Sequence, residues 1–105
     1  MYKVEQWPAA RQDMAEIVQY IAEALRSPVA ANNMIDKFQK AVQSLKHFPH
    51  RCPVVELNES FKQQGVNKEH RKLKVNNYLM LYQINEAEKT VTITRVIYNR
   101  RNYSA

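Results

Sequence analysis

Hydrophobic residues follow a helical period over the first half of the chain. In "PAARQDMAEIVQYIAEALR", beginning at Pro8, they recur at steps of three and four, which predicts an amphipathic helix. Ser27 and Pro28 then predict the N-cap and first turn of a second helix, from about residue 29 to 47. Only a few residues separate the helices, so we expect an antiparallel hairpin. The expected apolar stripes are Met14, Ile17, Val18, Ile21 and Leu25, then Ala31, Met34, Ile35, Phe38, Val42 and Leu45.

Strand patterns occupy both ends of the chain. Residues 2–7 alternate between apolar and polar side chains, and residues 70–75, 78–84 and 90–98 predict three further strands. The pair Asn76-Asn77 suits a two-residue turn, since asparagine tolerates positive φ. In the run "YLMLY", both alternating sets of positions are apolar, which predicts a central strand buried on both faces.

The order β-α-α-β-β-β predicts an α+β fold in a single domain, residues 1–105. We expect an antiparallel meander with the N-terminal strand alongside and the helical hairpin on one face. The other face should stay partly open. Residues 50–69 contain the single glycine, Gly65, and are expected to form a partly ordered surface loop.

Positive charge is concentrated in the last third of the chain. Residues 1–69 hold nine Lys/Arg and eight Asp/Glu, a net of +1, whereas residues 70–105 hold seven and two, a net of +5. The sum is the chain's net charge of +6. A basic surface on one group of strands suggests a polyanionic partner, either nucleic acid or an acidic protein segment. The alternative is a generally basic, solvated face.

Several classes of protein are disfavoured by composition. One glycine leaves no glycine-rich phosphate loop, and the basic third has no carboxylate pair for a magnesium-dependent nuclease. Its two acids, Glu86 and Glu88, have the pattern of solubilising turn residues. The lone Cys52 excludes an internal disulfide and suits a small apolar filler, so we expect no cofactor and no metal. No apolar stretch is long enough to span a membrane and no signal peptide is visible, so a cytoplasmic location is the default expectation.

The remaining candidates are cations and aromatic rings that can hold RNA phosphates and bases. Such residues can also cleave RNA without metal, when the 2′-hydroxyl attacks the adjacent phosphate and cations stabilise the added charge. Lys72 and Lys74 share one face of one strand, where each could lower the pKa of the other and so create a base. A solvated surface role is the alternative for either lysine alone. The candidates are His70, Arg71, Lys72, Lys74, Tyr78, Arg95, Tyr98, Arg100, Arg101 and Tyr103.

The sequence resembles the RelE/ParE superfamily of toxins from bacterial type II toxin–antitoxin modules. The resemblance covers nearly the whole chain and is carried by "LKHFP" and by the block "RKLKVNNYLMLYQINEAEKTVTITRVIYNRR". Relatives show R-x-L-x-V, N-Y-L-x-x-Y and R-V-x-H/Y-G-x-R-D/N, with Asn99 replacing the glycine here. The matching residues are Arg71, Leu73, Val75, Asn77, Tyr78, Leu79, Tyr82, Arg95, Val96, Tyr98, Asn99, Arg101 and Asn102.

The resemblance implies one of two actions. RelE-like members cut mRNA on the ribosome, which would make Lys72 and Lys74, with Arg100 or Arg101, the catalytic residues. Substrate would then be bound by Arg71, Arg95, Tyr98 and Tyr103. ParE-like members inhibit DNA gyrase without known nuclease chemistry.

The match to the nuclease pattern is incomplete. Leu79 replaces the arginine that nuclease members carry after the tyrosine, and Tyr103 lies closer to the arginines than in that pattern. The "NYL" block and the long hairpin lean toward ParE-like members.

The resemblance also implies a partner and a biological role. Toxins of this kind are neutralised by an antitoxin whose acidic, flexible tail wraps the basic surface, which gives a toxin–antitoxin hetero-oligomer. Growth inhibition and plasmid stabilisation are the roles implied. A third possibility is a non-toxic module that binds antitoxin or RNA.

Overall fold

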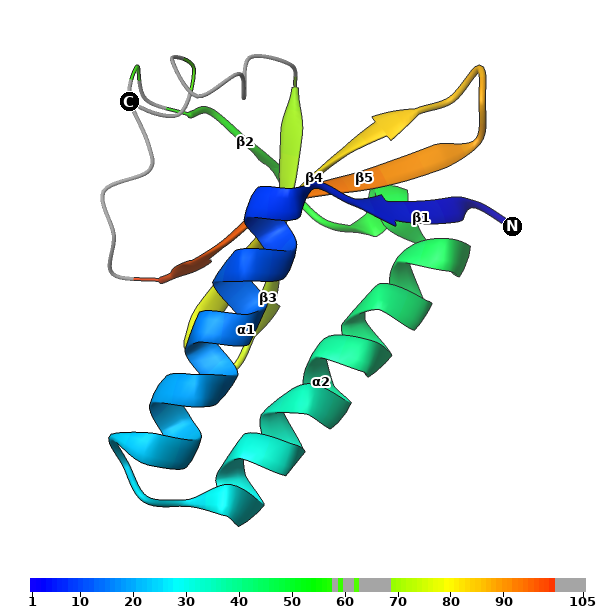
Figure 1. Ribbon diagram of the computed structural model, residues 1–105. Helices are drawn as coiled ribbons and strands as arrows, with labels where there is room; N and C mark the ends of the chain where they lie inside the picture. Colours follow the sequence, from blue (N-terminus) through cyan, green and yellow to red (C-terminus); the bar gives the residue numbers. More distant parts are fainter. Residues whose placement is uncertain (58, 60–61, 63–68, 100–105) are drawn as a thin grey trace.

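The computed structural model describes residues 1–57, 59, 62 and 69–99, and within them it forms two helices on a five-stranded sheet (Figure 1). This confirms the predicted α+β class. The helices α1 and α2 form the expected antiparallel hairpin (Figure 1). In chain order the elements are β1 (Lys3–Gln6), α1 (Pro8–Glu23), α2 (Pro28–His47), the 3₁₀ turn η1 (Pro49–Arg51), β2 (Val54–Val55), β3 (His70–Val75), β4 (Tyr78–Asn85) and β5 (Thr90–Tyr98).

The sheet has the strand order β1-β5-β4-β3-β2 and is mixed rather than purely antiparallel. The meander of β3, β4 and β5 is antiparallel as predicted, and β1 joins it by parallel pairing with β5. The segment expected to be a loop contributes η1 and the two-residue strand β2, which pairs with β3. That expectation was wrong for residues 50–51 and 54–55, because buried Val55 attaches this segment to the edge of the sheet.

The turn between β3 and β4 is the two-residue turn predicted at Asn76-Asn77. Asn76 has a φ of 55°, the left-handed region that asparagine enters more easily than most residues. Its side chain also accepts a hydrogen bond from Lys37 Nζ at 3.0 Å. The turn is therefore set by local chemistry and tied to α2.

The start of α2 agrees with the predicted cap, whereas the end of α1 does not. The Ser27 hydroxyl accepts the Ala30 N–H at 3.2 Å, which confirms the N-cap of α2. Helix α1 ends at Glu23, earlier than predicted, and Arg26 turns the chain with a φ of 51°. Leu25 is consequently 57% exposed rather than part of the apolar stripe.

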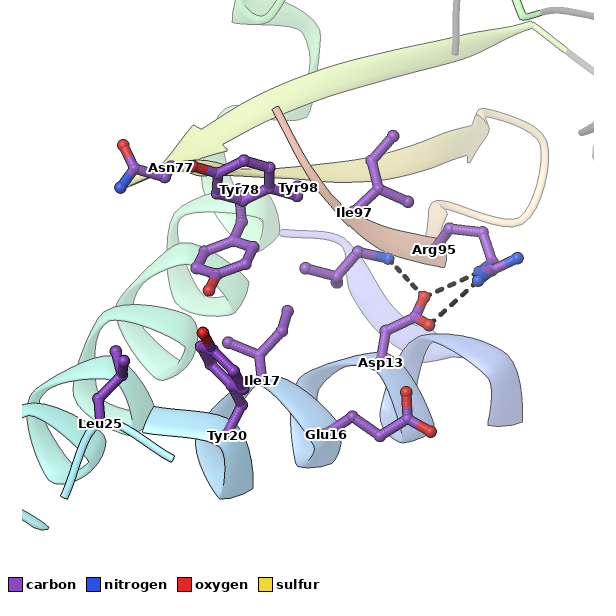
Figure 2. Close-up of a pocket in the computed structure, with 11 residues that line it drawn as sticks. Asp13, Glu16, Ile17, Tyr20, Leu25, Asn77, Tyr78, Arg95, Ile97 and Tyr98 are labelled. Carbon is purple, nitrogen blue, oxygen red and sulfur yellow. Dashed lines mark hydrogen bonds and ion pairs between the residues drawn. The ribbon is translucent and has the colours of Figure 1, made fainter. Parts of the chain in front are cut away.

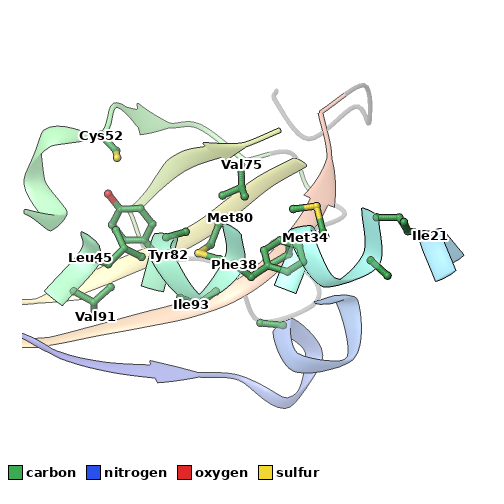
Figure 3. Close-up of a cluster of buried hydrophobic side chains, with 14 residues drawn as sticks. Ile21, Met34, Phe38, Leu45, Cys52, Val75, Met80, Tyr82, Val91 and Ile93 are labelled. Atoms are coloured by element: carbon green, nitrogen blue, oxygen red, sulfur yellow. The ribbon is translucent and has the colours of Figure 1, made fainter. Parts of the chain in front are cut away.

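The main core lies between the helical hairpin and one face of the sheet (Figure 3). Phe38 and Leu45 of α2 reach it from the predicted stripe, and the free thiol of Cys52 is buried there as an apolar filler. Ile35, also expected in the core, is 38% exposed. The cluster consists of Ala10, Ile21, Ala31, Met34, Phe38, Ala41, Leu45, Cys52, Val75, Met80, Tyr82, Val91, Ile93 and Val96.

A second apolar cluster occupies the other face of the sheet. Leu79 and Leu81 of β4 point into it, so β4 is buried on both faces as predicted. Val55 and Leu57 cover these leucines, and Trp7 packs against the same cluster. The face expected to stay partly open is therefore closed over its centre.

A β-bulge interrupts the pairing of β4 with β5. Leu81 pairs with Arg95 and Tyr82 with Ile93, so Thr94 is the extra residue. The Thr94 hydroxyl donates to the Leu81 carbonyl at 3.3 Å and forms a hydrogen bond with Nε2 of buried His70 at 2.9 Å. This buried polar contact links β3, β4 and β5 at the bulge.

Candidate functional site

The two candidate catalytic lysines, Lys72 and Lys74, lie side by side on β3, on the face of the second apolar cluster. We call this pair the lysine row. Lys72 pairs with Leu81 and Lys74 with Leu79, and cross-strand partners share a face. Lys72 is half-buried, whereas Lys74 is exposed. The Lys72 N–H donates to the Pro53 carbonyl at 3.2 Å, so the segment before β2 lies beside this row.

Arg71, which was predicted to bind substrate, contacts the chain around η1. Its Nη1 donates to the carbonyls of His50 and Cys52, at 3.1 and 2.6 Å. Tyr82, its cross-strand partner, donates its hydroxyl to the Pro49 carbonyl at 2.6 Å. Burial raises the pKa of this tyrosine well above its ordinary value. The Arg71 guanidinium therefore has a clear structural role on the helix-covered face.

Arg95, the second predicted substrate-binding arginine, forms a two-point ion pair with Asp13 of α1 (Figure 2). Its Nε and Nη2 lie 2.8 and 3.1 Å from the two carboxylate oxygens. The Asp13 carboxylate also accepts the Val96 N–H at 2.9 Å. The hydrogen bond to Asp13 raises the pKa of Arg95.

Tyr98 lies at the end of β5, on the face opposite the lysine row. It pairs with Tyr78, and the two rings meet edge to face with centroids 5.7 Å apart. The Tyr78 ring also packs against Phe38 of α2, at a centroid distance of 6.5 Å. The structure thus brings Lys72 and Lys74 together but separates them from Tyr98. Arg100, Arg101 and Tyr103 lie outside the described residues.

A cleft of about 580 Å³ runs between α1 and the second half of β5 (Figure 2). Asp13 and Tyr20 line the cleft from α1. Neither was a functional candidate in the sequence analysis, because the spacing of apolar residues along a helix does not single out its polar positions. Burial raises the pKa of Tyr78, and the neighbouring Tyr98 and Tyr20 raise it further. The lining residues are Asp13, Glu16, Ile17, Tyr20, Leu25, Asn77, Tyr78, Arg95, Val96, Ile97 and Tyr98.

Glu86 anchors a polar cluster at the far end of the sheet. It accepts hydrogen bonds from the Tyr2 hydroxyl and interacts with His50 Nε2 at 3.2 Å and Lys89 Nζ at 3.4 Å. These contacts, above all the Tyr2 and His50 hydrogen bonds, lower the pKa of Glu86 to about 2. Glu86 is thus more than the solubilising turn residue that was expected.

The described part of the chain contains no group of three or more His, Cys, Asp or Glu side chains able to hold a metal ion. None of its helices is long and apolar enough to cross a membrane.

The chain matches the family described as the ParE toxin of the type II toxin–antitoxin system, parDE, over residues 4–103. The protein belongs to the ParE toxin family. It is therefore a toxin of a type II toxin–antitoxin system, of the ParE/RelE kind. A comparison with curated proteins finds no match.

Solved structures share the fold of this ParE-family toxin. The chromosomal ParDE system of P. aeruginosa superposes with a TM-score of 0.68 at 16% identity, covering 93% of this chain and 96% of that one. The archaeal RelE–RelB complex of Pyrococcus horikoshii OT3 gives 0.61 at 15% identity, covering 96% and 98%. The RelBE2 toxin–antitoxin complex of Mycobacterium tuberculosis gives 0.57 at 19% identity, covering 92% and 96%. At these identities the likeness shows the fold alone.

Proposed function

We propose that this ParE-family toxin inhibits growth by acting on DNA gyrase, without cleaving RNA. The observation that carries the proposal is the placement of two side chains that were expected to bind the RNA substrate, Arg95 and Tyr98. Arg95 is paired with Asp13, and Tyr98 is on the sheet face opposite Lys72. Metal-free RNA cleavage needs a base, an acid and cations around one phosphate, and Tyr98 does not share a sheet face with the two lysines.

Leu79 supports the same proposal. Nuclease members carry an arginine at this position, whereas Leu79 is only 3% exposed and packs in the second apolar cluster. An arginine there would have to leave the cluster to reach a substrate. The match of residues 4–103 to the ParE family agrees with this reading.

The second candidate is ribosome-dependent mRNA cleavage, favoured by one observation. Lys72 and Lys74 lie side by side on one face, with Lys74 exposed. Two neighbouring ammonium groups can hold a phosphate between them.

Two assays on one preparation separate these functions. We expect purified toxin to abolish supercoiling by DNA gyrase at stoichiometric amounts and to leave mRNA intact in a translating extract. The double variant Lys72→Ala/Lys74→Ala should retain gyrase inhibition. Lys40→Ala, at an exposed position of α2, is the matched control. Ribosome-dependent cleavage lost in the double variant but kept in the control would overturn the proposal. Normal growth on induction without antitoxin would contradict both functions and favour a non-toxic module.

We also propose that an antitoxin with an acidic tail covers the lysine row and forms a hetero-oligomer with the toxin. The solved relatives are named as ParDE and RelBE systems or complexes, and the row presents cations beside an apolar cluster. We expect Lys72→Glu/Lys74→Glu to weaken binding of the neighbouring gene's product at least tenfold and to reduce its salt dependence. Lys40→Glu should have little effect. Equal loss in both variants would contradict a specific contact.

A further inference from the structure

The cleft between α1 and β5 has the opposite charge balance from the rest of the chain. Its charged lining residues are Asp13, Glu16 and Arg95, which sum to −1 on a protein of net charge +6. Asp13 is engaged by Arg95 and the Val96 N–H. Glu16 is exposed, accepts a hydrogen bond from Gln12 Nε2 at 2.9 Å, and lies near enough to Arg95 for its charge to help raise the pKa of that guanidinium. The cleft therefore offers a carboxylate that a cation can approach.

Three tyrosines from three elements surround the same cleft. Tyr20 extends from α1 and is 56% exposed, across from the edge-to-face pair of Tyr78 and Tyr98 (Figure 2). Aromatic faces attract ammonium and guanidinium groups, and arginine also stacks on them. The volume of about 580 Å³ lies within the range of about 300–1,000 Å³ usual for ligand pockets.

The edge of β5 beside the cleft can pair with an extended chain. Strand β1 pairs with β5 only as far as Ile93, and no other described strand continues on that edge. The Asn99 N–H bonds to the Asn77 carbonyl, so by antiparallel alternation the peptide groups of Val96 and Tyr98 face away from β4. The Val96 N–H on this edge already donates to Asp13 at 2.9 Å, so a peptide that adds to the sheet edge would pair at the Tyr98 end of the strand.

We propose that this cleft binds an arginine side chain carried by an extended segment of a partner protein. The guanidinium lies among the rings of Tyr20, Tyr78 and Tyr98 and pairs with Glu16, while the segment's backbone pairs with the edge of β5 at Tyr98, beyond the Val96 N–H that Asp13 occupies. An acidic segment is repelled here, so this surface and the lysine row select partners of opposite charge. The inference is independent of the target proposed above.

Nuclear magnetic resonance titration of the full chain with N-acetyl-arginine methylamide tests the proposal. We expect saturable shifts of the Tyr20 ring and of the Val96 and Tyr98 amides. The citrulline analogue, which has nearly the same shape and no charge, should bind at least fivefold more weakly. Equal binding of the two probes, or shifts confined to other surfaces, would overturn the proposal.

Variants on α1 sharpen the test. Glu16→Gln and Tyr20→Leu should each weaken arginine binding by about two- to fivefold, from the loss of one ion pair or one ring. Tyr20→Phe keeps the ring and should bind nearly as well. Glu23→Gln lies on the same helix outside the cleft and serves as the matched control. Unchanged binding in both Glu16→Gln and Tyr20→Leu would contradict the assigned contacts.

Discussion

Asp13 and Arg95 join α1 to β5 through two parallel hydrogen bonds, from Nε at 2.8 Å and Nη2 at 3.1 Å. Both side chains are largely buried, with 13% of Asp13 and 23% of Arg95 exposed. The pair begins where β1 stops pairing with β5, so it fixes the helix against the part of the strand that β1 leaves uncovered. Because the pair is partly buried and bidentate, it stabilises the fold more than an ordinary surface ion pair does.

Removing this carboxylate should destabilise the fold. We expect Asp13→Ala to lower the free energy of unfolding by about 2 kcal/mol, because Arg95 and the Val96 N–H both lose an acceptor in a partly buried place. Urea unfolding followed by circular dichroism measures the change. Asp36→Ala, at an exposed position of α2, should change it by less than about 0.5 kcal/mol. Equal effects of the two variants would show that the ion pair adds nothing.

The buried hydroxyl of Tyr82 makes a second testable contact. Tyr82→Phe should cost about 1–2 kcal/mol, because the buried carbonyl of Pro49 loses its hydrogen bond at 2.6 Å. Chemical denaturation again gives the difference. Tyr20→Phe removes a hydroxyl from a ring that is 56% exposed and should be nearly neutral. A neutral Tyr82→Phe would mean that water replaces the lost hydroxyl.

The β3–β4 turn should respond to backbone conformation rather than to polarity. Asn76→Ala should destabilise the protein by about 1 kcal/mol, because alanine resists a φ of 55°. Asn76→Gly should recover most of that loss, although it also lacks the side chain that Lys37 contacts. Asn77→Ala, at a residue without positive φ, is the matched control. Thermal unfolding that ranks Asn76→Gly with Asn76→Ala would assign the effect to the side chain instead.

Glu86 should titrate far below an ordinary glutamate. Its pKa falls from 4.5 to about 2 because the Tyr2 hydroxyl and His50 stabilise the carboxylate. A folded-state pKa below the unfolded value stabilises the fold above about pH 4.5, and this contribution is lost as the pH falls toward 2. Carboxyl carbon resonances measured against pH give the midpoint. Tyr2→Phe should raise that midpoint, and an unchanged midpoint would rule out the hydrogen bond as its cause.

The elements were predictable from the sequence because their signals are local. The helical stripes, the Ser27 cap and the Asn76 turn each depend on residues a few positions apart, and each was confirmed, apart from Leu25 and Ile35 in the stripes, which are exposed. The two-sided burial of β4 followed from its composition in the same way. The early end of α1 was missed because no glycine or proline marks the left-handed residue Arg26.

The surroundings of the candidate residues could not be predicted, because they arise from distant pairings. Asp13 and Arg95 are far apart in sequence, and nothing near either residue indicates the other as its partner. Likewise, the cover of Val55 and Leu57 over Leu81 comes from a segment with little periodic pattern. Sequence placed Lys72 and Lys74 on one face, but only the fold shows what lies beside them.

The position of β4 determines where opening of the fold will be most costly. It is the middle strand of the described sheet, paired on both edges and buried on both faces by separate clusters. The amide protons of Met80 and Leu81 can reach water only when both layers come apart, so their exchange with deuterium reports global unfolding. Slow exchange at these two amides therefore provides an internal gauge of stability for every variant above.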